Sequence, residues 1–434
     1  TDIMRFFIET FGCQMNKNDS LMMEASLLSS GFAPAENQND ADIVIFNTCS
    51  VRDSAERRAK GRLKEAMAQV RERKGIVVAA GCMAQRIPDF LTNGKYCSIA
   101  IGTYQSPSIG RIIENYLNGD KRRVFDSFEE NDYAGRISGT TDGWHKWITI
   151  THGCENFCTY CIVPYVRGKL ISASSGDILS NIESAVENGA IEITLLGQNV
   201  NQYGQDNGEI PFYKLLDKSA KINGIKRINF LTSHPKDFDT NIIEVIKNNE
   251  NISRSIHLPL QSGSDSILKQ MNRIYSFADY MKIIEKIKEL PDFSITTDLI
   301  VGFPGETDDD FEETIKAVKL VQYDEAFMYA YSPRETTPAA SFKNHLDKKI
   351  KSERLKILIE TQREISVLKL KARIGRTESV IIEGISRKNE NEVYGKSFLA
   401  HPVITSGNSS DTGKLLNVKI DSVKGSALIG TRVI

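Results

Sequence analysis

This sequence lacks long hydrophobic runs and an excess of charge of either sign. No apolar stretch approaches the roughly 20 residues that cross a bilayer, and the opening Thr-Asp-Ile-Met-Arg lacks a signal peptide's apolar segment. The 55 basic residues are balanced by 56 acidic ones, so a net charge of −1 creates no overall attraction to nucleic acid or to a membrane. We therefore expect a cytoplasmic protein without membrane contact, in which any RNA-binding surface is a local patch.

Cysteine is also scarce, and its odd count of seven does not suit a disulfide framework. Three of the seven nevertheless lie within eight residues, in Cys154-Glu-Asn-Phe-Cys158-Thr-Tyr-Cys161. Converging thiolates indicate a soft metal centre. Structural zinc normally takes four protein ligands, and no fourth cysteine or histidine follows closely, whereas a four-iron cluster can be held by three cysteines with one iron open. We interpret the loop as an iron–sulfur site and keep zinc as the alternative.

At 434 residues, the chain is long enough for two or three domains. Residues 1 to about 120 alternate short β-branched or aromatic runs with longer stretches of helical periodicity. The predicted strands are Arg5–Glu9, Ile43–Asn47, Ile76–Ala80 and Ser98–Ile101. The predicted helices are Asp19–Ser30, Ser54–Arg73, Gln85–Leu91 and Ser108–Leu117. This alternation implies a parallel sheet with helices on its faces.

Three further cysteines follow these predicted strands. Cys13 comes after the first, Cys49 after the second and Cys82 after the third. Loops after parallel strands gather at one sheet edge, where ligands bind, so these cysteines are expected to meet there. They are either three buried small hydrophobes or, as we favour, a second three-thiolate site. Cys97 lacks such companions, and we interpret it as a core residue.

A polar, acidic and glycine-rich stretch follows, and we interpret residues 123–143 as a linker. Beyond it, the strand Lys146–Thr151 precedes the cysteine loop, and a strand–helix rhythm continues downstream. The other predicted strands are Ile191–Leu196, Arg227–Leu231, Ser255–Leu258, Phe293–Val301 and Ala326–Tyr331. The predicted helices are Asp177–Asn188, Phe212–Ser219, Asn241–Asn248, Phe277–Leu290 and Asp308–Val321. Six such units predict a full or partial barrel, whose working face lies at the carboxyl ends of the strands.

Polar, glycine-rich loops follow five of these strands. They begin at Gly197, Thr232, Pro259, Gly302 and Tyr331. Singly, each loop is ordinary turn and cap chemistry, but together with the cysteine loop they predict a pocket for a polar small molecule. The same edge carries His152, His234 and His257, which we interpret as hydrogen-bonded wall residues and not as metal ligands.

The last hundred residues change character. Lys343–Arg373 is a long helical pattern with ten basic and four acidic residues, either a solvated helix or one suited to a phosphate backbone. Alternating strands then predict a small antiparallel barrel, at Glu378–Gly384, Glu392–Lys396, Leu415–Ile420 and Ala427–Ile434. Arg387, Lys388 and Lys396 could make it an RNA-binding module. Equally, the barrel could be a packing appendage of the preceding domain without a role in RNA binding.

These residues together resemble the radical S-adenosylmethionine (SAM) methylthiotransferases along nearly the whole chain. The cysteine loop is similar to the radical SAM cluster motif, with Tyr160 in the aromatic position before the third cysteine. The run from Asp298 to Glu306 resembles that superfamily's adenine-contacting strand. In the family's N-terminal domain three cysteines hold an auxiliary four-iron cluster, and these map onto Cys13, Cys49 and Cys82. The last domain occupies the position of the RNA-binding TRAM barrel.

Within the family, four motifs resemble the branch that acts on isopentenyladenosine beside the tRNA anticodon. They are Thr10-Phe-Gly-Cys-Gln-Met-Asn, Asn47-Thr-Cys-Ser-Val-Arg, Cys161-Ile-Val-Pro-Tyr-Val-Arg-Gly and Leu195-Leu-Gly-Gln-Asn-Val-Asn. Two features depart from the family pattern. Where members usually carry a Ser-Arg pair after Arg167-Gly, this chain reads Ile171-Ser-Ala-Ser-Ser, and the barrel between Glu392 and Gly413 diverges.

The resemblance implies an α/β protein of three domains. Residues 1–122 form the N-terminal parallel sheet domain, 144–372 a partial (β/α)6 TIM-like radical SAM core, and 373–434 an antiparallel TRAM-like barrel. It implies two [4Fe-4S] clusters, on Cys13, Cys49 and Cys82 and on Cys154, Cys158 and Cys161. The expected SAM-binding residues are Tyr160, Gln198, Ser233, Gln261 and Ile300. No catalytic residue is expected beyond the cluster ligands.

The implied reaction inserts a methylthio group at C2 of N6-isopentenyladenosine at position 37 of tRNA, using two SAM. No general base at neutral pH usefully deprotonates that carbon, so radical chemistry carried by a cofactor is the plausible route. The cluster of the Cys154–Cys161 loop would generate the radical from SAM, and the first domain would supply the sulfur. The target base would be flipped out of the anticodon stem-loop. We further expect an electron donor such as flavodoxin or ferredoxin, a sulfur-supplying system, and a monomer.

Two other classes of function remain open at this point. The same chemistry could act on threonylcarbamoyl-adenosine in tRNA or on an aspartate of a ribosomal protein. Alternatively, the chain could be a zinc-containing RNA-binding protein without catalytic activity.

Overall fold

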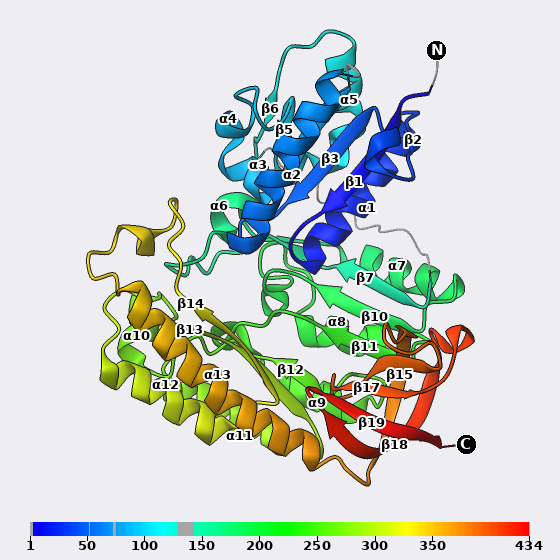
Figure 1. Ribbon diagram of the computed structural model, residues 1–434. Coiled ribbons are helices and arrows are strands. Elements are labelled where there is room, and N and C mark those ends of the chain that lie inside the picture. Colours follow the sequence, from blue (N-terminus) through cyan, green and yellow to red (C-terminus); the bar gives the residue numbers. More distant parts are fainter. Residues whose placement is uncertain (1–2, 52, 73–74, 129–142, 434) are drawn as a thin grey trace. The chain divides into compact units, whose positions relative to one another are not determined.

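The computed structural model describes residues 3–51, 53–72, 75–128 and 143–433, and the chain divides into two compact units (Figure 1). The first unit takes residues up to 140 together with Trp147–Glu155 and Cys161–Ser174. The second takes the remainder. Most of the predicted linker lies in 129–142, outside the described residues, and the segment that precedes this gap contains a short strand, β6 (Val124–Phe125).

The first unit is built on a six-stranded parallel sheet in the order β2-β1-β3-β4-β5-β6. The strands before β6 are β1 (Arg5–Thr10), β2 (Ala33–Pro34), β3 (Ile43–Thr48), β4 (Ile76–Gly81) and β5 (Ile99–Ile101). Every residue of β3 and β4 is buried, which is expected when helices cover both faces of a parallel sheet. The predicted parallel α/β sheet is confirmed.

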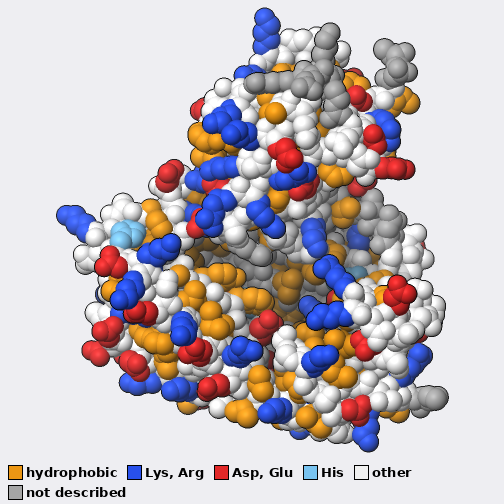
Figure 2. Space-filling view, in the orientation of Figure 1, with side chains coloured by type: hydrophobic (Ala, Val, Ile, Leu, Met, Phe, Trp, Pro, Cys, Tyr) orange, Lys and Arg blue, Asp and Glu red, His pale blue; other side chains and the backbone are white. Residues whose placement is uncertain are grey.

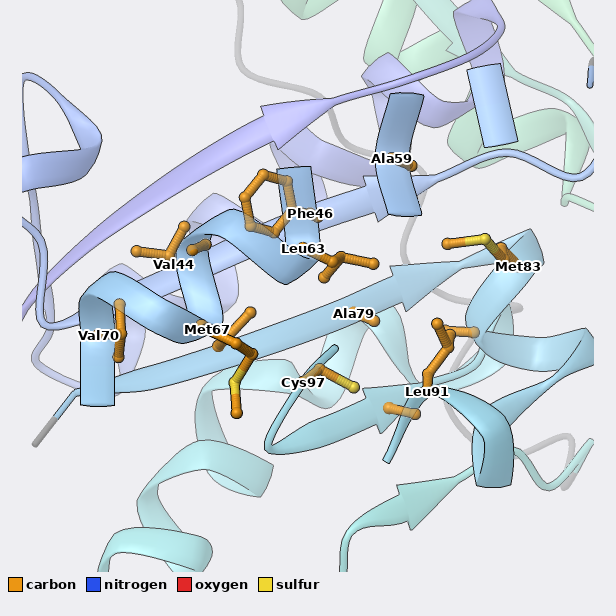
Figure 3. Close-up of a cluster of buried hydrophobic side chains, with 14 of the residues drawn as sticks. Val44, Phe46, Ala59, Leu63, Met67, Val70, Ala79, Met83, Leu91 and Cys97 are labelled. Atoms are coloured by element: carbon orange, nitrogen blue, oxygen red, sulfur yellow. The ribbon is translucent and has the colours of Figure 1, made fainter. Parts of the chain in front are cut away.

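Alternate residues of the strands enter two cores. Val44, Phe46 and Ala79 face α2 (Asp53–Glu72) in the cluster drawn in Figure 3. Ile43 and Ile45 point the other way, toward α1 (Gln14–Ser29) and α5 (Ile109–Leu117). Cys97 is fully buried in the first cluster, which confirms it as a core residue (Figure 3).

Two helices of this unit differ from the prediction. α1 begins at Gln14, five residues before the expected Asp19, because Cys13 already takes the extended N-cap conformation. The single helix expected over Gln85–Leu91 is two short helices, α3 (Cys82–Arg86) and α4 (Pro88–Leu91). They separate at Ile87, since proline disfavours helical geometry in the residue before it.

The second unit contains the strands of the predicted partial barrel. β12 (Ser255–His257), β13 (Ser294–Val301) and β14 (Glu325–Ala330) pair in parallel, as do β10 (Glu192–Leu196) and β11 (Arg227–Phe230). β10 also neighbours β7 (His145–Thr149), whose first two residues belong to this unit. A parallel bridge between Ile228 and Ile252 continues the series toward β12.

Helices separate these strands along the chain. They are α7 (Ser175–Glu187), α8 (Phe212–Ala220), α9 (Asn241–Asn248), α10 (Asp265–Gln270), α11 (Phe277–Lys288), α12 (Asp308–Val321) and α13 (Lys348–Lys371). α9 and α12 have the predicted bounds, and α12 begins with a capping box between Thr307 and Asp310. α10 was not predicted. No helix in the described parts of the chain is long and apolar enough to cross a membrane.

The C-terminal strands close into a barrel in the order β15-β16-β17-β19-β18. They are β15 (Thr377–Ile385), β16 (Glu392–Ser397), β17 (Pro402–Ser406), β18 (Leu415–Lys424) and β19 (Ala427–Val433). The predicted barrel is confirmed, and it is mixed because β17 and β19 run parallel while the other pairs are antiparallel. β17 was missed because it is short and starts with proline.

This small barrel is docked on the amino ends of the partial-barrel strands. The turn between β16 and β17 accepts hydrogen bonds from Arg227, Ser253 and Ser294 through the carbonyls of residues 396 to 399. Arg227 also forms a buried bidentate ion pair with Glu192. The ion pair fixes the Arg227 guanidinium, and its remaining nitrogen donates to the carbonyls of Lys396 and Ser397, so the small barrel docks on an oriented donor.

Part of the basic character of α13 is used inside the protein. Arg354 pairs with Glu306 and Asp308, and Lys369 pairs with Asp324. On the face shown in Figure 2, basic and acidic side chains are interspersed over the lower part of the view, where α12 and α13 lie. α13 therefore combines internal ion pairs with exposed basic residues, among them Lys348, Lys349 and Arg363, and its contact with a phosphate backbone stays a prediction.

Candidate functional site

The three cysteines of the first unit stand at the carboxyl ends of adjacent strands. Cys13 lies between β1 and α1, Cys49 directly follows β3, and Cys82 directly follows β4 as the first residue of α3. β3 pairs with both β1 and β4, so the three positions share one edge of the sheet. The predicted meeting of these residues is therefore built into the strand order.

Two glycines allow this edge to be tightly packed. Gly12 has φ +112°, and a Cβ there would lie 2.5 Å from Cys49 Cβ and 2.9 Å from its Sγ. Gly81 has φ +87°, and a Cβ there would lie 2.4 Å from Asn47 Oδ1. Any other residue would strain the backbone and push the neighbouring strand-end loop away.

Two asparagines tie the strand-end loops together. Asn16 donates from Nδ2 to the carbonyls of Phe11 and Thr48, at 2.8 and 2.9 Å. Asn47 donates from Nδ2 to the carbonyl of Asn16 at 2.7 Å. Because these groups are buried, each bond also prevents the cost of an unsatisfied backbone carbonyl, and the edge is held in one conformation.

The segment that follows Cys161 belongs to the same unit. α6 (Val163–Arg167) ends in Arg167, whose guanidinium donates to Asp19 Oδ2 at 2.7 Å and to Asn16 Oδ1 at 3.1 Å. Ile162 and Val166 pack with Cys82 in a small buried cluster. The chain just after the cysteine loop is thus fixed beside the first cysteine site.

The donor set of this edge fits a thiolate-bound cluster. Burial raises the pKa of the Cys82 thiol to about 12, Arg167 lowers it, and Cys49 and Cys13 raise it further, so the three sulfurs act on one another. Such a thiol gives up its proton when it binds a metal. In the described residues, no three or more His, Cys, Asp or Glu side chains are arranged to hold a single metal ion. Each cysteine of a four-iron cluster binds a different iron. Such a cluster therefore does not need several donors around one metal ion, as a structural zinc site does.

In the second unit, Cys158 is buried and faces two nitrogen donors. Arg273 Nη1 lies 3.6 Å from its Sγ and His234 Nε2 lies 3.9 Å away. His234 Nδ1 accepts the backbone N–H of Lys236, which places the ring proton on Nε2, toward the sulfur. Burial lowers the pKa of His234 to about 2, with Arg273 and Lys236 adding to the shift, so this ring is neutral.

Polar side chains hold the residues around Cys158. Asn156 donates to Asp237 Oδ2 at 3.1 Å and accepts from Gln202, while Asn199 donates to the same Asp237 oxygen at 2.6 Å. Asn199 and Gln202 follow β10, and Asp237 follows β11. Two of the predicted polar loops therefore orient the cysteine loop.

The predicted cofactor residues lie in this unit. The backbone of Ile300 donates to Gln261 and that of Gln261 to Asp298, both at 2.9 Å, and Ile300 packs with Tyr160 against the Phe303 cluster. Gln198 and Ser233 follow β10 and β11, and Ser233 adjoins His234. Across the described chain, Gln198 Oε1, Ser233 Oγ and Gln261 Oε1 are buried without a hydrogen-bond partner. Three such atoms among five predicted residues are what a missing polar ligand would leave behind.

One face of the β12–β14 sheet carries solvent-exposed aromatic side chains. The strand register places Asp298 beside Phe327 and Ile300 beside Tyr329, and the two rings are 43% and 45% exposed. His257 hydrogen-bonds Thr296 and Asp298 and meets the edge of Phe327 at 5.9 Å between ring centres. The opposite face is buried along β13, and the exposed face combines aromatic surface with a polar pair.

The predicted RNA-binding residues do not form one group. Arg387 and Lys388 are exposed in the turn between β15 and β16, and Lys396 is exposed at the far end of β16. The carbonyl of Lys396 accepts a hydrogen bond from Arg227, so this residue also lies at the docking surface of the barrel. The exposed Arg387 and Lys388 are compatible with an RNA-binding module, and Lys396 is compatible with a barrel that packs on the preceding domain.

Sequence reasoning missed Arg273 altogether and described His234 only as a wall residue. Arg273 follows α10, the helix that was not predicted, and no periodicity marks it. His152 was also predicted as a wall residue. It packs edge-on against Tyr104 in the first unit, and burial holds its pKa well below the usual value.

Two sequence families match parts of the chain. Residues 148–318 match the radical SAM superfamily, and residues 5–102 match Uncharacterized protein family UPF0004. Over 99% of its length, the chain is 41% identical to a tRNA-2-methylthio-N(6)-dimethylallyladenosine synthase of Clostridium botulinum (strain Okra / Type B1), covering 97% of that protein. It is 40% identical to the protein of the same name from Clostridium tetani (strain Massachusetts / E88), with 99% and 96% coverage.

Solved structures of other radical SAM enzymes share the fold. The radical S-adenosylmethionine methyltransferase TsrM from Kitasatospora setae matches with a TM-score of 0.59 at 13% identity, over 78% of this chain and 75% of that one. The cobalamin-dependent radical enzyme OxsB matches with a TM-score of 0.53 at 11% identity, over 84% and 56%. Identities this low speak for the architecture alone.

Proposed function

The chain belongs to the family of tRNA-2-methylthio-N(6)-dimethylallyladenosine synthases, and we propose that it is a radical SAM methylthiotransferase acting on N6-isopentenyladenosine at position 37 of tRNA. The product carries a methylthio group at C2 of that adenine. Near-complete coverage of both chains is the observation that carries this proposal, since it includes both cysteine sites and the C-terminal barrel.

Two four-iron clusters are assigned to six cysteines. Cys13, Cys49 and Cys82 would hold one, and Cys154, Cys158 and Cys161 the other. The shared sheet edge and the electrostatic coupling among the first three thiols support the first assignment. The short spacing of the loop and the two donors facing Cys158 support the second.

SAM is assigned to Tyr160, Gln198, Ser233, Gln261 and Ile300. The three buried oxygens without partners in the described chain would accept or share hydrogen bonds with its polar groups. Ile300 and Tyr160 provide an apolar wall for its adenine. When bound, the clusters supply one-electron cleavage of SAM at the Cys154 loop and sulfur for transfer at the first domain.

The chain's own residues would bind and orient the target base. The exposed rings of Phe327 and Tyr329 offer stacking surface for an adenine that has left the anticodon-loop stack, and their apolar edges suit an isopentenyl group. Asp298 and His257, beside Phe327, offer polar groups to the edge of the purine. A prenylated purine needs both kinds of surface.

The remaining partners follow from the reaction. One-electron cleavage of SAM needs a low-potential donor such as flavodoxin or ferredoxin, and repeated turnover needs a sulfur-supplying system. The tRNA would be gripped through the barrel turn at Arg387 and Lys388, which makes binding weaken as salt rises. We propose that the protein works as a monomer.

The test of this function is nucleoside mass spectrometry of tRNA. Cells that carry the gene are expected to contain 2-methylthio-N6-isopentenyladenosine, and cells without it only N6-isopentenyladenosine. The assigned substrate would be contradicted if cells without the gene still methylthiolated all of their isopentenyladenosine. Accumulation of unmodified threonylcarbamoyl-adenosine in those cells would then indicate the other tRNA substrate.

Replacing Phe327 with alanine should weaken recognition of the prenylated base without affecting the cofactor sites. Base–aromatic stacking is worth about 1–3 kcal/mol, so kcat/KM for prenylated tRNA should fall by roughly 5- to 150-fold. SAM cleavage without tRNA should stay at the wild-type rate. Phe90→Ala, at a ring 46% exposed in the first unit, is the matched control. Equal kcat/KM values for the two variants would remove Phe327 from the substrate site.

A further inference from the structure

Arg273 is a buried cation in the second unit. The residue is 5% exposed, and its guanidinium is fixed by three groups. Nε bonds the hydroxyl of Tyr275 at 2.9 Å, Nη2 donates to the carbonyl of Pro259 at 2.7 Å, and Nη1 points at Cys158 Sγ, 3.6 Å away. All its donor nitrogens are thus aimed at defined partners.

In the described part of the chain, this charge has no carboxylate partner. Among the residues that the structure describes, no Asp or Glu oxygen lies within ion-pair distance of the Arg273 guanidinium, although the other buried arginines of this unit, such as Arg227 and Arg354, each have one. A buried, unpaired charge is costly, so an anionic partner is expected at this position. Among the described residues, the titratable acidic groups that act on it are Tyr275, Tyr160 and the thiol of Cys158.

The local backbone holds Cys158 in register with Arg273. Thr159 donates from its backbone N–H to Met271 and from its hydroxyl to Gln270, at 3.0 and 2.9 Å. On the other side of the cysteine, Asn272 Nδ2 donates to the carbonyls of Asn156 and Phe157. The three residues before Arg273 therefore bind the residues on both sides of Cys158.

We propose that Arg273 is a positioning and charge-balancing residue for the cluster of the Cys154 loop, acting through Cys158. A thiolate-bound cluster is anionic and gains one more negative charge when it takes up an electron. A fixed guanidinium that donates to a ligand sulfur stabilises the more negative state, and His234 Nε2–H adds a neutral donor to the same sulfur. These two donors thereby raise the reduction potential of the cluster, toward the potential of the protein that supplies its electron.

This proposal needs one part of the proposed function, namely that the Cys154–Cys161 loop binds a four-iron cluster. The test uses the full-length reconstituted enzyme. The cluster of interest is identified by its electron paramagnetic resonance signal that changes on addition of SAM, and its midpoint potential is measured by redox titration. Iron content and 5′-deoxyadenosine formation are measured in parallel.

Arg273→Gln removes the charge. At a given applied potential, we expect the ratio of reduced to oxidised cluster to fall about tenfold. For a one-electron couple this is a shift of the midpoint potential by about 59 mV to more negative values. Iron content should stay at the wild-type level. Lys269→Gln removes the same charge from an exposed position in α10, one turn away, and should leave the potential unchanged.

Arg273→Lys covers the case in which Arg273→Gln loses its iron. Lysine keeps the charge but cannot make the three bonds of the planar fork, so a smaller shift in the same direction is expected. A wild-type potential in an iron-replete Arg273→Gln or, failing that, Arg273→Lys variant would overturn the proposal. So would an equal shift in Lys269→Gln. None of these readouts depends on a tRNA product, so failure of the assigned substrate is recognised separately by nucleoside analysis.

Discussion

Replacing Cys158 with alanine is expected to abolish both SAM cleavage and methylthio-adenosine formation. Cys158 is the buried member of its loop, and its sulfur faces Arg273 and His234. Without this ligand the loop offers only two thiolates, and the guanidinium is left with no anionic partner among the described residues. Chromatography with mass spectrometry should find 5′-deoxyadenosine at background level, and iron content should fall to about half of the wild-type value, one cluster of two.

The control for this variant is Cys97→Ala. It also removes a fully buried thiol, but from the core of the first unit, where Cys97 lies in one cluster with Ala79 and Leu91 (Figure 3). It should keep both products and all its iron, at a stability cost of about 1–2 kcal/mol for the small cavity. Normal amounts of 5′-deoxyadenosine from Cys158→Ala would show that the loop is not the site of SAM cleavage.

The sheet of the first unit and its cysteine edge could be predicted because their signals are local. Buried parallel strands read as continuous apolar runs, as in Ile43–Thr48 and Ile76–Gly81, and each ends directly before a cysteine. The rule that parallel strands share their carboxyl edge then brings distant cysteines together without further information. The bounds of α9 and α12 were predictable for a similar reason, since amphipathic periodicity marks both helices and α12 also begins with a capping box.

What could not be predicted depends on tertiary contacts. α10 is only six residues long, too short for periodicity to show, and Arg273 follows it in an irregular segment. Its importance appears only when Cys158, more than a hundred residues earlier in the chain, is seen beside it. The packing of α6 with the first unit depends likewise on the ion pair of Arg167 with Asp19.

Charge counts along the sequence were the least informative signal. The excess of basic residues around α13 left a solvated helix and a surface for phosphates open, and in the structure Arg354, Lys369 and Arg373 pair with carboxylates of the same unit. A count of charged residues along one helix does not include the acidic partners that other elements supply. The turn residues Arg387 and Lys388 have no such internal use in the described chain, and they remain the residues predicted to contact tRNA.

Replacing Cys49 with alanine should separate the two halves of the reaction. Cys49 contacts the Gly12 turn, and its Sγ accepts the backbone N–H of Val51 at 3.3 Å, so it sits at the centre of the first cysteine edge. Alanine removes one of three thiolates there and leaves every residue that faces Cys158 unchanged. SAM cleavage should therefore continue, while the methylthio nucleoside should fall to background because its sulfur source is lost.

The measurement is the ratio of methylthio nucleoside to 5′-deoxyadenosine in one anaerobic reaction with prenylated tRNA. That ratio should be near zero for Cys49→Ala, unchanged for Cys97→Ala in the same unit, and undefined for Cys158→Ala because neither product forms. A Cys49→Ala enzyme that made normal methylthio-adenosine would show that the first edge does not supply sulfur. Loss of both products would show instead that the two sites depend on each other structurally, through the α6 segment that packs against Cys82. The three variants together therefore distinguish a division of labour between two clusters from a single site supported by a second domain.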